Sequence, residues 1–133
     1  MRKLVIISFC CLVLSACATV SKTSDGLGYE GYNRDGETVE GTLTRLRNDP
    51  GIKIRTERRW TVATSKSGRV IWSFTPKDHP AHPSFVKREV IEKDGRIYIN
   101  TSARCGSEKH VCDKLARDFI QLNNKALDHM STN

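Results

Sequence analysis

The sequence predicts an α+β domain in which an antiparallel meander sheet of about five strands is covered by one C-terminal helix, in two layers. Three observations indicate this fold class. Several short segments alternate apolar and polar residues, turn residues separate these segments, and the last long segment has helical apolar spacing instead. An antiparallel sheet with one apolar face needs a cover, and a helix with a broad apolar stripe supplies it.

The first predicted strand covers residues 38–47. This segment is rich in threonine and carries Val39, Leu43 and Leu46, and we interpret it as the hairpin partner of the strand that follows. Between the two strands, residues 48–51 read Asn-Asp-Pro-Gly, which predicts a turn.

The second predicted strand begins at Ile52. Through residues 52–62 most even positions are apolar and the odd positions are polar, which is typical of a strand with one wet face. Arg58 is the exception, because strict alternation points it toward the apolar side beside Trp60. Either a β-bulge at Arg58-Arg59 reverses the alternation, or Arg58 is a paired or edge residue.

Three further strands and a helix complete the expected fold. Residues 69–75 predict a core strand with three apolar residues on one side: Val70, Trp72 and Phe74. Residues 86–93 and 96–103 predict a hairpin, because the Asp94-Gly95 pair between them is a strong signal for a two-residue turn. From about residue 108 to 129, apolar residues recur at helical spacing.

The N-terminus predicts a membrane anchor. Arg2 and Lys3 precede a short apolar run over residues 4–14, which is too short for a permanent transmembrane helix, and the run ends in Leu14-Ser15-Ala16-Cys17. This pattern resembles the signal of bacterial lipoproteins. The resemblance implies cleavage before Cys17, a lipid on the Cys17 thiol, and retention at the outer membrane, since no aspartate follows the cysteine.

The chain is accordingly divided into three parts. Residues 1–16 are the expected signal peptide, residues 17–36 a lipidated, glycine-rich tether, and residues 37–133 a single domain. With the two cysteines of the signal removed and Cys17 acylated, Cys105 and Cys112 remain. The oxidising compartment that the resemblance implies then predicts a disulfide between them.

Charge narrows the class of partner. After the signal is removed, 20 Lys and Arg face 15 Asp and Glu, an excess that fits an anionic neighbour in the cell envelope. An ordinary solvated surface of mixed charge is the alternative. The expected location outside the cytoplasm and the lack of a recognition motif argue against nucleic acid.

Two groups of residues are candidates for a partner-binding site. His79 and His82 belong to a segment rich in proline, residues 75–83, which we expect near polyproline geometry with both histidines on one side. The segment is interpreted as a connector, as a stiff recognition loop, or with Asp78 as the start of a metal site.

The second candidate group is basic. Arg55, Arg58 and Arg59 belong to a cluster that would bind an anionic partner, unless neighbouring glutamates neutralise it across the sheet.

No catalytic motif is visible in the sequence, and we expect neither an enzyme nor a bound cofactor. The leading hypothesis is a lipid-anchored module that binds an envelope protein or a cell-wall partner. The alternatives are a periplasmic inhibitor or immunity protein, and a metal-binding protein or hydrolase that uses His79 and His82.

Overall fold

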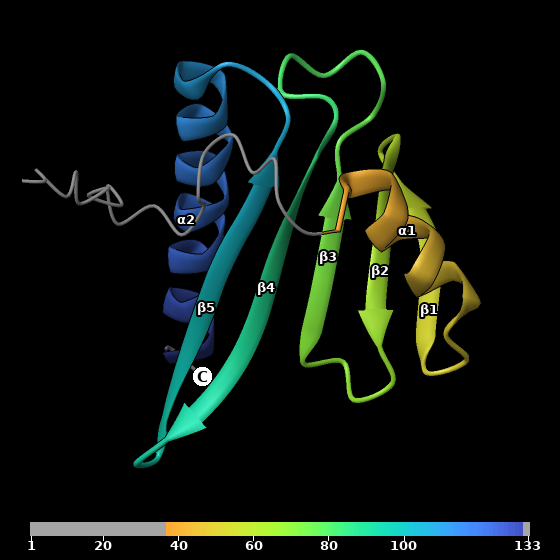
Figure 1. The fold of residues 1–133 in the computed structure, drawn as a ribbon. Helices are drawn as coiled ribbons and strands as arrows, with labels where there is room; N and C mark the ends of the chain where they lie inside the picture. The colour runs from red at the N-terminus through yellow and green to blue at the C-terminus, as the bar shows by residue number, and fades with distance from the viewer. Residues whose placement is uncertain (1–36, 132–133) are drawn as a thin grey trace, which may run out of the picture.

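Residues 37–131 form one antiparallel sheet with two helices in the computed structural model, which describes this part of the chain (Figure 1). The elements are α1 Val39–Asn48, β1 Ile52–Glu57, β2 Trp60–Ser65, β3 Val70–Phe74, β4 Ser84–Lys93, β5 Arg96–Cys105 and α2 Lys109–Ser131. The strands lie in chain order, β1-β2-β3-β4-β5. The predicted α+β fold is therefore confirmed. The expected signal peptide, Cys17 and the tether lie outside the described residues.

The segment before the sheet is a helix, so the predicted strand over residues 38–47 is wrong. Thr38 caps α1, because its side-chain oxygen accepts a hydrogen bond from the backbone N–H of Gly41 at 3.0 Å. The apolar residues of α1 recur at i, i+4 and i+7, on one side of the helix: Val39, Leu43 and Leu46. Leu46 is only 1% exposed, and burial on this scale stabilises the fold by about 2 kcal/mol.

A two-residue turn at Arg58-Arg59 divides the predicted strand of residues 52–62 into β1 and β2. Glu57 and Trp60 form the register pair next to the turn. Neither a bulge nor an edge position explains the break in alternation. The turn sends the apolar residues of β1 and those of β2 to opposite faces of the sheet: Ile52 and Ile54 on one, Trp60 and Val62 on the other.

The sheet has a hydrophobic cluster on each face. On the α1 face, α1 packs over strands β1 to β3, and the cluster consists of Val39, Leu43, Leu46, Ile52, Ile54, Ala63, Trp72, Phe74 and Phe85. On the α2 face, α2 packs over β4 and β5, and the cluster consists of Trp60, Ala81, Val86, Ala103, Cys105, Val111, Cys112, Leu115 and Phe119. Figure 1 shows α1 crossing the near side of the strands at one end of the sheet, and α2 beside β5 at the other end.

Each half of the sheet is therefore covered by one helix, and the two helices lie on opposite faces. Beyond Phe85, the arrangement leaves the α1 face of β4 and β5 without a helical cover among the described residues, and beyond Trp60 it likewise leaves the α2 face of β1 to β3 uncovered. No helix in residues 37–131 is both long and apolar enough to cross a membrane.

The hairpin of β4 and β5 agrees with its prediction. Asp94 and Gly95 form its turn and both have positive φ, 52° and 70°, which is the conformation that two-residue hairpin turns require. Both strands are ten residues long, so the hairpin reaches beyond the neighbouring strand β3 (Figure 1).

Candidate functional site: a braced arginine turn

Three connections of the chain lie at the same end of the sheet. Strands β1, β3 and β5 run in one direction, so their C-terminal ends lie at the same end of the sheet (Figure 1). The first connection at this end is the turn at Arg58-Arg59, which we name the arginine turn. The second is residues 75–83, which we name the proline loop, and the third is the connection from β5 to α2. Most of the residues predicted to bind a partner come from these connections.

The arginine turn has an unfavourable backbone for its residues. Arg58 and Arg59 have φ values of 45° and 74°, in the left-handed region that a two-residue hairpin turn needs and that Asn-Gly or Asp-Gly normally provides. For a residue with a Cβ atom, this conformation costs about 1–2 kcal/mol. Contacts of the side chains must therefore help to hold the turn.

Two contacts brace the turn against the proline loop. Arg59 Nη1 lies 2.7 Å from Asp78 Oδ2, in an ion pair whose side chains are 72% and 57% exposed. The ring of Trp60, next along the chain, meets the ring of His79 edge to face, with centroids 5.2 Å apart. Trp60 also meets Phe119 of α2 in the same manner at 5.7 Å. The turn, the loop and the helix are thus joined through one indole ring.

The proline loop consists of successive turns, so the expectation of polyproline geometry is wrong. The backbone N–H groups of His79 and His82 donate to the carbonyls of Pro76 and His79, at 3.0 and 2.8 Å. Thr75 and Ser84 close the loop, since the Ser84 N–H donates to Thr75 Oγ1 at 3.0 Å and the Thr75 N–H to the Ser84 carbonyl at 2.9 Å. Internal hydrogen bonds, rather than extended proline geometry, stiffen the loop.

The two histidines have different partners. His79 Nδ1 accepts a hydrogen bond from the backbone N–H of Ala81 at 3.0 Å. Burial lowers the pKa of His79, and the charge of Lys114 lowers it further against the opposing charges of Asp118 and Asp78. His82 Nδ1 instead lies 3.2 Å from the Thr75 carbonyl oxygen. Within residues 37–131 no three His, Cys, Asp or Glu side chains gather into a group that could hold a metal ion.

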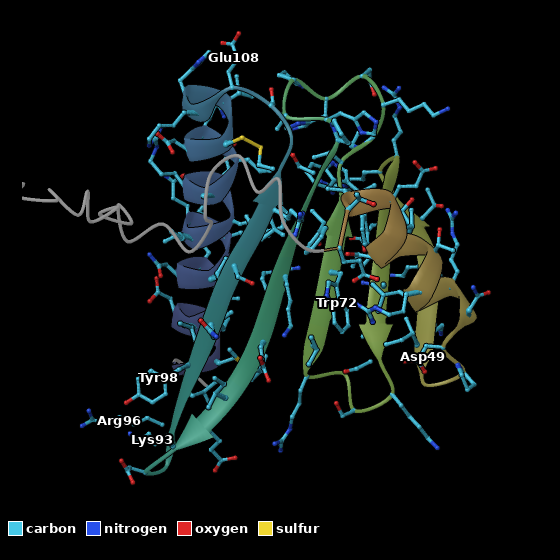
Figure 2. All side chains as sticks on the ribbon, viewed as in Figure 1. Asp49, Trp72, Lys93, Arg96, Tyr98 and Glu108 are labelled. Carbon is cyan, nitrogen blue, oxygen red and sulfur yellow. A yellow bond between two sulfur atoms is a disulfide. The ribbon has the colours of Figure 1, made fainter. Side chains whose placement is uncertain are left out.

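The loop is also tied to α2. The predicted disulfide between Cys105 and Cys112 is present, with Cα atoms 5.8 Å apart, and it joins the first turns of α2 to the end of β5 (Figure 2). Between the two cysteines, Ser107 Oγ donates a hydrogen bond to the carbonyl of Pro80 at 3.0 Å. The loop therefore has a fixed support on the helix side and on the turn side.

Arg55 lies on β1, away from the arginine turn. It contacts Thr64 Oγ1 through Nη1 at 3.0 Å and the Glu57 carboxylate through Nη2 at 3.3 Å. A glutamate therefore pairs with Arg55, but along the same strand rather than across the sheet as the alternative from the sequence expected. Arg55 is not part of the exposed cationic group at the turn.

Two residues that organise this region are not among the predicted site residues. Trp60 was placed on the apolar side of its predicted strand, and in the structure its ring joins the proline loop and α2 directly beside the arginine turn. Arg88 of β4 lies over the ring of Phe119, 5.3 Å from the centroid, and its buried Nε has no hydrogen-bond partner among the described residues. Burial lowers the pKa of Arg88. The signal for Arg88 was its alternation with buried Val86, which places it on the same face.

The site as a whole is suited to binding an anion. Arg58 and Arg59 are exposed, on a backbone whose conformation is fixed by the brace. A guanidinium group presents its donors in a planar fork that matches a carboxylate or a phosphate. Such a group binds more tightly when its position is set beforehand, because less conformational entropy is lost.

The comparisons with known proteins add no further assignment. No family model, no curated protein and no solved structure matches this chain.

Proposed function

We propose that this chain is a non-enzymatic, lipid-anchored protein of the bacterial envelope whose domain binds an acidic protein or cell-wall partner through the arginine turn. The anchoring rests on the N-terminal signal that ends at Cys17. The binding rests on the structure of the domain. The expected location is the outer membrane, with the domain on the periplasmic side.

One observation carries the binding proposal. Two consecutive arginines occupy left-handed positions where asparagine and glycine are more stable, and the ion pair to Asp78 and the contact of Trp60 hold them there. Backbone strain that tertiary contacts maintain is concentrated at functional sites. An exposed Arg58 beside an Arg59 whose guanidinium is held by the Asp78 carboxylate is a chemically sensible use of that strain.

Cross-linking in intact cells followed by pull-down tests this proposal. Arg58→Ala with Arg59→Ala should reduce partner recovery by about 30-fold, as expected for loss of a binding hot spot of 2 kcal/mol. Lys66→Ala with Arg69→Ala is the matched control, since it removes two exposed cations from the turn between β2 and β3 at the opposite end of the sheet. Wild type and control should recover the same partner.

Two results would overturn the binding proposal. One is equal recovery by all three chains. The other is a monomeric protein without an enriched partner that turns over cell-wall fragments. The anchor is tested separately. The mass of the N-terminal peptide shows whether Cys17 carries a lipid. On cell fractionation, the Cys17→Ser chain should appear in the soluble fraction instead of the membrane fraction.

A narrower form of the same function is inhibition of an exported enzyme. Enzymes that cleave glycosidic bonds use a pair of carboxylates in a cleft, and a braced pair of arginines on a hairpin turn is complementary to such a pair. Purified domain should then inhibit a muramidase, and Arg58→Ala with Arg59→Ala should abolish the inhibition. Undiminished muramidase activity in the presence of excess wild-type domain argues against this form.

A further inference from the structure

The uncovered part of the α1 face on β4 and β5 has an unusual composition. We name it the hairpin patch, and its nine positions are Lys87, Glu89, Ile91 and Lys93 of β4 with Arg96, Tyr98, Asn100, Ser102 and Arg104 of β5. Four of these residues are cations and one is a carboxylate. The patch also exposes two large apolar side chains that face each other across the strands, Ile91 at 39% and Tyr98 at 47%.

Within residues 37–131, no ion pair joins Lys93 or Arg96, at the free end of the patch, to a carboxylate. Lys93 and Arg96 are directly opposite each other in the register, and like charges in that position destabilise a strand pair. Glu89 lies further along, 3.6 Å from Lys87. Figure 2 shows Lys93, Arg96 and Tyr98 at the projecting end of the hairpin. A chain segment that combines aromatic and acidic residues would complement this surface.

The chain enters the domain at the opposite end of the patch. Glu37 comes immediately before Thr38, the N-cap of α1, and its pKa is lowered by a hydrogen bond from Arg45 and also by the charge of Arg104. Figure 1 shows α1 beginning at the end of the sheet where β3 and β5 end, and Arg104, the last residue of the patch, is next to the last residue of β5. The segment that precedes Glu37 is covalently joined to the domain at this point.

The sequence of that preceding segment matches the patch in chemistry. Residues 28–36 read Gly-Tyr-Glu-Gly-Tyr-Asn-Arg-Asp-Gly, with two tyrosines and a net charge of −1. The domain, residues 37–133, has 18 Lys and Arg against 12 Asp and Glu. The segment is acidic and aromatic and the patch is basic and partly apolar, so the two are complementary in charge and in apolar character.

The lengths match as well. Tyr29 is eight residues from Glu37, and Arg96 is eight residues from Arg104, which in extended chain is about 26 Å in both cases. Tyr32 is five residues from Glu37, which places it between Tyr98 and Asn100 when the segment runs along β5. A covalently attached segment also has a millimolar effective concentration, so weak contacts suffice to hold it.

We propose that residues 28–36 dock on the hairpin patch, with Tyr29 and Tyr32 against Ile91 and Tyr98 and with Glu30 facing Lys93 and Arg96. Docking shortens the free tether from residues 18–36 to residues 18–27. Its r.m.s. span falls from about 24 Å to about 17 Å, which brings the domain closer to its anchor. The inference does not depend on lipidation or on the arginine turn.

Disulfide trapping in the full chain without its signal tests the docking. The chain carries Cys17→Ser, so that it needs no membrane, and retains the Cys105–Cys112 disulfide. One variant adds Asn33→Cys and Asn100→Cys, four residues from Glu37 and from Arg104. The matched control adds Asn33→Cys and Ile97→Cys, an exposed position of the same strand on the opposite face. We expect the first pair to form its cross-link at least about tenfold faster, since docking raises the local concentration of the two thiols.

Replacing both tyrosines of the segment by serine should remove this advantage. Because Tyr29 and Tyr32 precede the domain, this variant tests the contact without altering the core of the domain. Equal cross-linking to the two faces overturns the proposal, as does an unchanged rate in the tyrosine variant. Cross-links that form mainly between two chains at low concentration also overturn it, and assign the patch to a second copy. Equal cross-linking together with flotation on phosphatidylglycerol vesicles assigns the patch to a membrane instead.

Discussion

The two-residue turns of this sheet share one backbone conformation and differ in everything else. Asp94-Gly95 and Arg58-Arg59 both have positive φ at both positions. The first pair is suited to the turn, and neither of its residues forms an ion pair or ring contact with another part of the chain that the structure describes. The second pair is unsuited to the turn, and contacts with Asp78 and through Trp60 to His79 hold it.

The comparison shows where local preference is sufficient and where tertiary contacts replace it. An Asp-Gly turn is stable through its own residues, so it can project from the sheet without support. The arginine turn depends on the proline loop and α2 for its conformation. The left-handed backbone at the arginine turn lowers the stability of the domain and exposes two guanidinium groups. Strain of this kind is the pattern expected of a binding site.

The largest expected effect comes from removing the support of the arginine turn. Replacing Cys105 and Cys112 by alanine opens a loop of eight residues, which on the chain-entropy model lowers the free energy of unfolding by about 2.5 kcal/mol. Urea denaturation measures this loss. Hydrogen exchange should accelerate in the proline loop and leave the amides at Asp94-Gly95 unchanged, and uniform acceleration would contradict a local brace.

Exchanging the residues of the unsupported turn should have the next largest effect. Asp94→Arg with Gly95→Arg should lower the free energy of unfolding by about 1.5 kcal/mol, because no contact compensates for left-handed arginines. A Cβ at Gly95 meets no atom within 4 Å, so the cost is one of backbone conformation alone. Urea denaturation with Gly95→Ala as the intermediate variant checks this, and a neutral effect would show that the arginine turn needs no brace.

The converse exchange should stabilise the domain. Arg58→Asn with Arg59→Gly relieves the strained turn and loses an exposed ion pair, for a net gain of about 1 kcal/mol in the free energy of unfolding. The same variant should lose partner capture. Thermal unfolding and pull-down on one preparation measure both, and a variant that is less stable than wild type would refute the assignment of strain.

The smallest expected effect is a pH dependence at the brace. Burial and Lys114 lower the pKa of His79, against the opposing charges of Asp118 and Asp78, so the folded state binds this proton less readily than the unfolded state. Its contribution to stability is fully present above about pH 6.5, the unfolded value, and is lost as the pH falls through the folded value. The free energy of unfolding, measured by denaturation between pH 5 and 8, should fall as the pH falls. The slope should be smaller in the His79→Gln variant and unchanged in the His82→Gln variant.

The sequence predicted the parts of the fold that depend on local signals. The Asp94-Gly95 turn, the strands around it and the C-terminal helix follow from turn residues and periodicity. Val39, Leu43 and Leu46 also carried a helical signal, since their spacing of four and three residues is that of a helix. The threonines and the expectation of a hairpin outweighed it, and the N-cap at Thr38 was overlooked.

The candidate site was less predictable because tertiary contacts form it. Nothing in the local sequence marks Arg58-Arg59 as a turn, since its conformation depends on Asp78 and Trp60. The assumption of a single apolar face concealed the change of face between Ile54 and Trp60. The disulfide was predictable because the processing that the lipoprotein resemblance implies leaves one pair of cysteines, Cys105 and Cys112.

The diagonal placement of the helices divides the domain in sequence as it does in space. Residues 39–74 form α1 with three strands, residues 84–131 form two strands with α2, and the proline loop connects the two halves. Each half lends one aromatic ring to the other: Phe85 packs in the α1 cluster against Phe74, and Trp60 packs in the α2 cluster against Phe119. Each half therefore completes the hydrophobic cluster of the other. If the chain were cut within the proline loop, the two fragments would each keep the aromatic ring that the other half packs, and we expect them to reassociate into the folded domain.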